Sequence, residues 1–160
     1  MNDIVFREAS LNDKPVLLEF EQHVIQAERP FNSAIKSVDA YYYDMADLLN
    51  SKKSHLLVAE INGVVVASGY AQIRTSKQSL VHDFHSYLGF MYVVPEFRGR
   101  GINKSILERL IQWSTNQGVS DCYLDVYSGN EAAIRAYQKA GFVNSMIEMK
   151  LNCSNYCSNY

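Results

Sequence analysis

Apolar and polar positions in the first fifty residues follow first a strand-like and then a helix-like spacing. Ile4–Arg7 alternates briefly, which predicts a strand. After Pro15, which the first turn of a helix tolerates, apolar residues recur every three or four positions to Ala27 and predict a helix. A second helix is expected from Asp39, a residue type that favours the N-cap, to Leu49. This part of the chain therefore predicts one strand and two helices.

The middle of the chain predicts three consecutive strands. His55–Ile61 and Val64–Ile73 are apolar, β-branched runs joined by Asn62-Gly63, a dipeptide that favours a tight hairpin. The third run, Phe84–Val94, is apolar at consecutive positions in Leu88–Val94, as expected of a strand covered on both faces. Two antiparallel strands and a buried third strand are therefore expected here.

The last third predicts helix, strand, helix and strand. Apolar residues at helical spacing run from Ile102 to Trp113, and Gly118 ends that helix. Asn130 and Gly141 are suited to the N-cap and the C-cap of the last helix. The strands flanking this helix are expected at Cys122–Tyr127 and Met146–Leu151.

The element order, β-α-α-β-β-β-α-β-α-β, predicts an α/β fold. The strands on either side of the Ile102 helix should form a right-handed parallel crossover, whereas the earlier strands should be antiparallel. A mixed sheet with helices on both faces follows. The length of 160 residues suits one domain, expected over residues 1–151, followed by a disordered tail over 152–160.

Composition and charge narrow the functional classes. Fifteen Lys and Arg residues against 17 Asp and Glu residues give a net charge of −2, so the chain lacks the positive field that general nucleic-acid binding requires. No apolar run approaches the ~18 residues of a membrane span, and the N-terminus lacks a secretory core. The three cysteines make an odd count and two of them lie in the C-terminal tail, which argues against a disulfide framework. The four histidines lie elsewhere in the sequence, which argues against a zinc site near the cysteines. We expect a cytoplasmic protein that binds neither metal, membrane nor nucleic acid.

A glycine-rich stretch between the buried strand and the Ile102 helix is the most informative segment. Gly99 and Gly101 let the backbone approach a ligand closely, because neither carries a Cβ. The amides of the following helical turn carry partial positive charge, and Arg98, Arg100 and Lys104 add full charges. This arrangement favours a phosphate or pyrophosphate.

Two common phosphate-binding motifs do not fit this segment. In a Walker-type loop the last Gly is followed by Lys and Ser or Thr, whereas here Asn103 precedes Lys104-Ser105 and Arg98 takes the first Gly position. The dinucleotide fingerprint needs a third Gly where Lys104 stands. A solvated turn remains the plain structural alternative.

The segment resembles the acetyl-CoA signature of the GCN5-related N-acetyltransferase (GNAT) family. Arg98-Gly99-Arg100-Gly101-Ile102 follows Val93-x-Pro95, as in the family pattern Arg/Gln-x-x-Gly-x-Gly/Ala, and Asn103 departs from its last position. A second match, Asn130-x-x-Ala133-x-x-x-Tyr137-x-x-x-Gly141-Phe142, is similar to the family's fourth helix and the turn that closes it. The resemblance covers Ile4–Leu151 and implies the GNAT-like fold.

The resemblance implies direct transfer of an acetyl group from acetyl-CoA to a primary amine of a small molecule or peptide. In such proteins the central strand separates from the next one, and its free backbone pairs with the pantetheine arm. The residues implied in cofactor binding are Met91, Tyr92, Val93, Arg98, Gly99, Arg100, Gly101, Ile102, Asn103, Lys104, Asn130 and Tyr137. A metal is not implied.

Catalytic and acceptor residues follow from the same resemblance. Tyr137 is the expected general acid toward the leaving thiolate, with a packed core aromatic as the alternative. Asp125 and Tyr87 lie where relatives carry catalytic glutamates, and His85 shares the strand parity of Tyr87. A dedicated base is not required by the sequence. The acceptor side is expected to include Glu28, Phe31, Tyr42 and His85. The segments Glu28–Phe31 and Tyr41–Asp44 are similar to one bacterial-type subgroup, which does not define a substrate.

Two other functional classes stay open at this point. A non-catalytic acyl-CoA-binding module would keep the glycine loop without acceptor chemistry. An unrelated nucleotide-phosphate protein would use the same loop chemistry for another ligand. The acceptor is not defined by the sequence, and the protein is expected to be a monomer or a homodimer.

Overall fold

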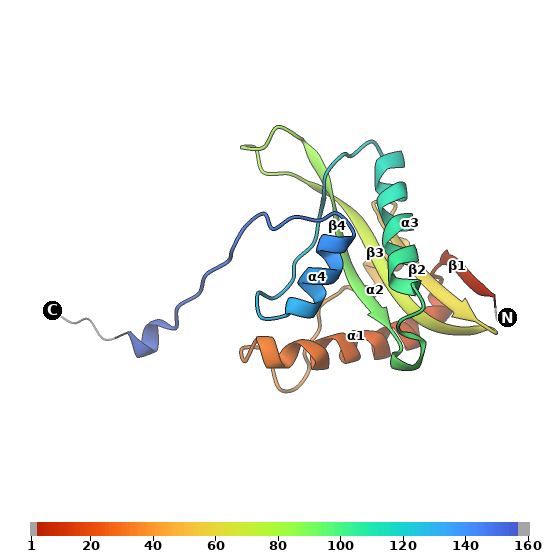
Figure 1. The fold of residues 1–160 in the computed structure, drawn as a ribbon, viewed down its shortest axis with the longest axis horizontal. Coiled ribbons are helices and arrows are strands. Elements are labelled where there is room, and N and C mark those ends of the chain that lie inside the picture. Colours follow the sequence, from red (N-terminus) through yellow and green to blue (C-terminus); the bar gives the residue numbers. More distant parts are fainter. Residues whose placement is uncertain (1–2, 157–160) are drawn as a thin grey trace.

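The computed structural model describes residues 3–156 of the chain (Figure 1). These residues form a five-stranded sheet with helices around it. The strands and helices, in chain order, are β1 (Ile4–Glu8), α1 (Lys14–Glu28), α2 (Met45–Asn50), β2 (Ser54–Ile61), β3 (Val64–Thr75), β4 (Phe84–Val93), α3 (Ile102–Asn116), β5 (Cys122–Tyr123) and α4 (Glu131–Lys139).

The sheet is mixed, as the element order predicted. Its strand order is β1-β2-β3-β4-β5. The first three pairs of neighbours are antiparallel, whereas β4 and β5, which α3 connects, are parallel. The predicted fold class and the predicted parallel pairing of the strands on either side of the Ile102 helix are therefore confirmed.

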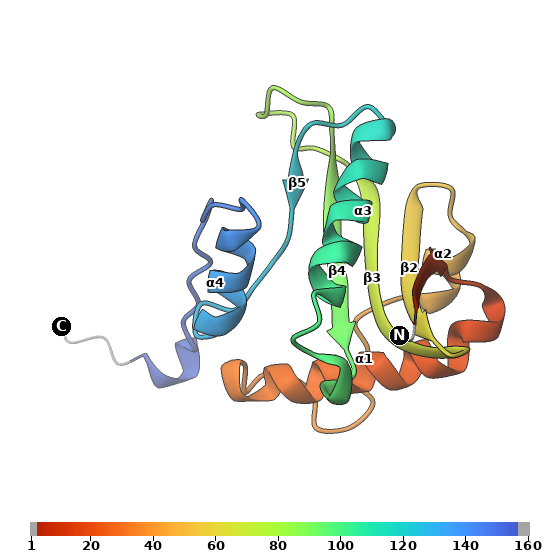
Figure 2. The same cartoon turned by 45° about the vertical axis from the view of Figure 1, so that its right-hand side comes forward.

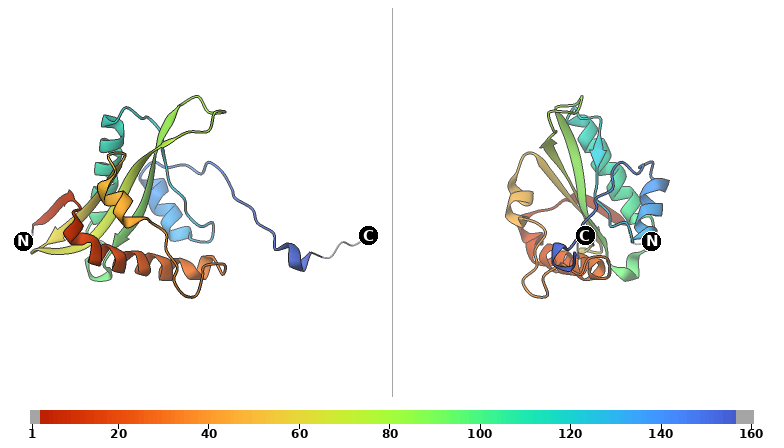
Figure 3. Two further views of the ribbon diagram at one scale, coloured as in Figure 1. Left: turned by 180° about the vertical axis from the view of Figure 1, so that it is seen from behind. Right: turned by 90° about the vertical axis from the view of Figure 1, so that its left-hand side faces the viewer.

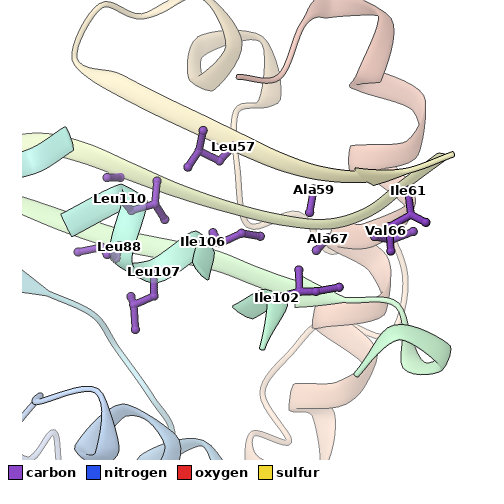
Figure 4. Close-up of a cluster of buried hydrophobic side chains, with 11 residues drawn as sticks. Leu57, Ala59, Ile61, Val66, Ala67, Leu88, Ile102, Ile106, Leu107 and Leu110 are labelled. Atoms are coloured by element: carbon purple, nitrogen blue, oxygen red, sulfur yellow. The ribbon is translucent and has the colours of Figure 1, made fainter. Parts of the chain in front are cut away.

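Two apolar cores cover the two faces of the sheet. Successive side chains of a strand point to opposite faces, so Leu57 and Ala59 of β2 pack toward α3, whereas Leu56 and Val58 pack toward α1 and α2. Figure 4 shows the first core, in which the buried side chains of α3 lie over the sheet. The side chains of α3 in that core are Ile102, Ile106, Leu107 and Leu110.

The sheet divides next to β4. The β4–β5 ladder consists of Ser86 opposite Cys122 and Tyr87 opposite Tyr123. Beyond Tyr123 the chain leaves the sheet and runs toward α4, so the C-terminal half of β4 has no neighbouring strand on that side among residues 3–156 (Figure 2). The split expected from the family resemblance is present.

The start of the second helix was predicted wrongly. The second helix does not begin at Asp39, which adopts a left-handed φ of +53°. It begins at Met45, with Asp44 as its N-cap. The reason is the buried carboxylate of Glu21, whose Oε1 accepts hydrogen bonds from the amides of Tyr42 and Tyr43 at 2.8 and 2.9 Å and keeps them out of a helix.

The C-terminal strand predicted at Met146–Leu151 is also wrong. The segment after α4 runs away from the sheet without joining a strand of the described residues (Figures 1 and 3). The predicted strand at Cys122–Tyr127 ends already at Tyr123, so no regular sheet edge lies beside the later segment to pair with it. In the expected tail, a short 3-10 turn spans Cys153–Asn155, and residues 157–160 lie outside the described range.

Within residues 3–156, every helix is too short or too polar to cross a lipid bilayer.

Candidate functional site

A cleft of about 410 Å³ lies at the split in the sheet. Four elements border it: the end of α1, the second half of β4, the loop into α3, and the segment from Asp125 through α4. Its lining includes ten of the twelve residues that the sequence assigned to cofactor binding, namely Met91, Tyr92, Val93, Arg98, Gly99, Gly101, Ile102, Asn103, Asn130 and Tyr137.

The glycine loop has the backbone that its sequence suggested. Gly99 and Gly101 adopt φ values of +77° and +75°, in the left-handed region that glycine tolerates best. A Cβ built on either residue would have no neighbour within 4 Å, so both face open space. Gly101 is the N-cap of α3, whose first amides lack partners within the helix. The loop therefore fits an anionic group such as a pyrophosphate.

The three cations of the loop are placed differently. Arg98 lines the cleft, and its Nε donates to the Val93 carbonyl at 2.9 Å. Arg100 lies over the Phe97 ring at 5.1 Å, and the Lys104 ammonium lies 3.8 Å from Glu108. Neither of the latter is a cleft-lining residue, so their roles in ligand binding stay predictions.

The second half of β4 presents backbone groups to the cleft. The Val94 amide donates to the Val66 carbonyl of β3 at 2.9 Å. Because backbone groups alternate along a strand, the amides of Met91 and Val93 point away from β3, toward the cleft. These amides lie where a thioester oxygen could be bound.

Tyr137 lies half-buried on the cleft side of α4. Its ring packs edge-on against Phe142 with centroids 5.9 Å apart, and the Phe142 amide donates to the Tyr137 carbonyl at 3.0 Å. Burial raises the pKa of the phenol, and the negative charge of Glu28 adds to this. The hydroxyl therefore stays protonated at neutral pH, as a proton donor must.

Asn130 both lines the cleft and caps α4. Its side-chain oxygen accepts from the Ala133 amide at 3.3 Å. The cap fixes the start of the helix that carries Tyr137 two turns later. Its predicted capping role is therefore present, and its contact with a cofactor stays a prediction.

Asp125 and Tyr87, the two residues at positions where relatives carry catalytic glutamates, form a hydrogen-bonded pair. The Tyr87 hydroxyl donates to Asp125 Oδ2 at 3.0 Å, and the Arg74 guanidinium lies 3.8 Å from the centre of the Tyr87 ring. Burial, followed by the Asp125 charge, raises the pKa of Tyr87. Asp125 is exposed and lines the cleft, whereas Tyr87 does not line it. Of the pair, Asp125 is the group available to accept a proton.

Tyrosine and carboxylate side chains gather at the α1 end of the cleft. Glu28 lines the cleft together with Tyr127, a residue that the sequence did not single out. Tyr127 stacks on Phe31 with centroids 6.4 Å apart, and its hydroxyl accepts from Asn32 at 3.0 Å. Burial raises the pKa of Tyr42, with further contributions from Glu28 and then Tyr127. Phe31 and Tyr42 therefore both lie beside Tyr127, and of the predicted acceptor residues Glu28, Phe31 and Tyr42 only Glu28 lines the cleft itself.

His85 lies outside the cleft, where the β3–β4 hairpin meets β5. Its Nδ1 is 2.9 Å from the Ser76 hydroxyl, which also lies 2.7 Å from His82 Nδ1, and His82 Nε2 is 3.0 Å from the Tyr123 hydroxyl. This network ties the β3–β4 hairpin to β5, and His85 is not among the cleft-lining residues. Within residues 3–156, no three His, Cys, Asp or Glu side chains are grouped in a way that could hold a metal ion.

Comparison with known proteins connects this geometry to a family. The family model described as "Acetyltransferase (GNAT) family" matches residues 21–142. The chain is 25% identical over 158 residues to the uncharacterized N-acetyltransferase YjgM of Escherichia coli K12, covering 95% of this chain and 88% of that protein. It is 26% identical over 112 residues to an aminoglycoside N(6')-acetyltransferase type 1 of Salmonella typhimurium, covering 65% of this chain and 72% of that protein.

A solved structure shares the fold. The crystal structure of a predicted acetyltransferase from Clostridium acetobutylicum with acetyl-CoA has a TM-score of 0.75 and 18% identity, over 96% of this chain and 99% of that one. The expected family and the expected acyltransferase class are confirmed by the family match and by these relatives. From the match over residues 21–142, the chain belongs to the GNAT family of acetyltransferases.

Proposed function

We propose that this protein transfers the acetyl group of acetyl-CoA directly to a primary amine of a small molecule or peptide. One observation carries the proposal: a single cleft joins the left-handed glycine loop, the unpaired half of β4 and the protonated phenol of Tyr137. One bound ligand could therefore contact the groups that bind an anion, position a thioester and donate a proton.

The residues present fit acetyl-CoA. Gly99, Gly101 and the first amides of α3 would hold the pyrophosphate, with Arg98 beside them. The open side of β4 at Met91 and Val93 would hold the pantetheine arm through backbone hydrogen bonds. When bound there, acetyl-CoA supplies an activated acetyl group on sulfur.

Transfer forms a carbon–nitrogen bond and breaks the carbon–sulfur bond. A β4 amide, from Met91 or Val93, stabilises the negative charge that develops on the carbonyl oxygen, a contribution of about 3 kcal/mol for one such donor. Tyr137 donates its proton to the leaving sulfur, and the proton that the nitrogen loses as the amide forms restores the phenol, directly or through water. The acceptor must first lose its extra proton, and Asp125 is the cleft-lining carboxylate that can accept it, directly or through water.

A cationic acceptor suits the charges of the cleft. Glu28 and Asp125 are carboxylates in its lining, and Tyr127 contributes an aromatic face. The similarity to an aminoglycoside N(6')-acetyltransferase supports an amine acceptor of this kind. We therefore propose that Glu28 attracts the protonated amine, with Phe31 and Tyr42 shaping its surroundings.

The direct test is an acetyl-transfer screen over an amine library, with release of the free thiol as the readout. The decisive variant is Tyr137→Phe, which removes the proton donor and keeps the ring. We expect kcat to fall by about 10²–10⁴-fold, the usual contribution of a general acid, with coenzyme A affinity unchanged.

Tyr41→Phe is the matched control, because Tyr41 is 70% exposed and does not line the cleft. It should retain full activity. An active wild type whose turnover survives Tyr137→Phe would refute the acid role, and absence of turnover with every amine would favour a binding module.

A further inference from the structure

Strand β4 carries one more residue than β3 at the edge of the cleft. Tyr70 lies opposite Gly89, and Ser68 lies opposite Tyr92. Phe90 and Met91 therefore both face Gly69, which makes a β-bulge.

The bulge requires an unusual backbone at Phe90. This residue adopts φ +55°, in the left-handed region that large side chains rarely occupy. Such a conformation persists only where neighbouring groups hold it in place. Phe90 is 2% exposed, and its ring packs against the Tyr43 ring with centroids 4.8 Å apart, but this packing does not supply a donor to the Phe90 carbonyl.

The hydroxyl of Ser68 fixes that peptide group. Ser68 is fully buried, and its Oγ donates to the Phe90 carbonyl at 3.0 Å. A buried carbonyl without a donor is costly, so this hydrogen bond favours the bulged conformation. It also connects the two strands at the position where their pairing changes.

The bulge decides which β4 amides reach the cleft. Before it, the Ser86 amide donates to the Asp121 carbonyl at 2.9 Å, so even-numbered residues face β5. After it, the Val94 amide donates to the Val66 carbonyl at 2.9 Å, so even-numbered residues face β3. The extra residue therefore turns Met91 and Val93 toward the cleft; a regular ladder would turn them toward β3.

We propose that Ser68 is a positioning residue, whose hydroxyl holds the Phe90 bulge and thereby directs the Met91 and Val93 amides into the cleft. Its kinetic consequence rests on the proposed acetyl transfer. Its structural consequence, the direction of the β4 amides, does not depend on that function.

The kinetic test compares Ser68→Ala with Ser86→Ala. Both serines are fully buried, and Ser86 Oγ bonds to the Ser114 hydroxyl at 2.7 Å, before the bulge. For Ser68→Ala we expect kcat to fall about tenfold or more, as when an oxyanion donor is misplaced. The loss of coenzyme A affinity should be smaller, because the same amides hold the pantetheine arm but the glycine loop is unchanged. Ser86→Ala should keep its kcat, and Ser68→Cys, whose thiol is a weak donor, should recover part of the loss.

A second readout is amide hydrogen exchange of Met91, Tyr92 and Val93, measured by NMR on the ligand-free protein. In the wild type the Tyr92 amide, paired with β3, should exchange more slowly than its two neighbours. Ser68→Ala should abolish that difference, and Ser68→Cys carries the same test if the alanine variant does not fold.

The possible outcomes separate the positioning role of Ser68 from the proposed acetyl transfer. An unchanged exchange pattern in the Ser68 variants overturns the positioning role, whether or not the wild type is active. The positioning role is also overturned if Ser86→Ala reproduces the loss of kcat, or if Ser68→Ala loses coenzyme A affinity by the same factor as kcat. A wild type that transfers no acetyl group refutes the proposed function, and the exchange experiment still decides the role of Ser68.

Discussion

At the scale of single residues, the glycine loop combines two separate requirements. Gly101 needs freedom of φ because it caps α3 in the left-handed region, and it also needs open space because the proposed ligand lies there. Gly118 shares the first requirement, with φ +85° and no atom within 4 Å of the place that a Cβ would take, but it lies at the far end of α3. Gly118 is therefore a matched control position for substitutions at Gly101.

We predict that Gly101→Val abolishes coenzyme A binding, whereas Gly118→Val does not. Both variants should lose a similar amount of stability, about 1–3 kcal/mol, because each forces a β-branched residue into positive φ. Isothermal titration with coenzyme A and thermal unfolding of both variants measure the two effects. Normal affinity in folded Gly101→Val would contradict the placement of the pyrophosphate.

Residues in local motifs were predictable from the sequence, whereas residues acting across strands were not. Gly99, Gly101 and Tyr137 have fixed spacing to their neighbours, so the sequence revealed them. Ser68 acts on Phe90, 22 positions away, through a bulge that leaves no periodic signal. Tyr127 escaped notice because its partner Asn32 lies 95 positions away.

At the scale of elements, an ion pair fixes the start of α1 to β1. The Arg7 guanidinium bonds both oxygens of Asp13, at 2.8 and 2.9 Å, and also reaches Glu60 on β2 at 2.9 Å. Asp13 Oδ2 further accepts from the Ser10 amide at 2.7 Å. These contacts, led by the hydrogen bonds from Arg7, lower the pKa of Asp13 to about 2.

We predict that this pair makes stability sensitive to acid. A carboxyl whose folded pKa is depressed stabilises the protein above its unfolded pKa of ~3.8, and this contribution disappears as the pH falls toward about 2. Asp13→Asn should therefore lower the free energy of unfolding at pH 7 by about 1–2 kcal/mol and flatten its decline below pH 4. Urea unfolding at several pH values measures this, with exposed Asp83→Asn as the control; parallel pH curves for wild type and Asp13→Asn would contradict it.

Elements with strong periodicity were predicted to within a few residues, and the errors have long-range causes. α1, α3 and the β2–β3 hairpin follow local patterns, whereas the start of α2 depends on Glu21, a side chain from another helix. Met146–Leu151 has a strand-like composition, but a strand also needs an edge to pair with.

At the scale of the whole molecule, binding of one ligand should stabilise the fold selectively. In the proposed site acetyl-CoA would contact both the loop and the open side of β4, whereas ATP and NAD lack the pantetheine arm that would reach β4. We predict a rise in Tm of several degrees with acetyl-CoA at about 100 times its Kd, corresponding to about 2.7 kcal/mol, and little change with equal ATP or NAD. Differential scanning fluorimetry measures this, and an equal rise with all three nucleotides would instead favour a general phosphate site.

The short β4–β5 ladder has a consequence for the proposed proton transfers. Two residue pairs join the strands, and Asp125, just past them, is tethered to Tyr87 of β4 by its hydrogen bond. Tyr137 lies farther along the chain on α4 and is held by packing against the first core instead of by strand pairing. In the proposed transfer, the proton acceptor is therefore fixed by the sheet, whereas the position of the proton donor depends on how α4 packs.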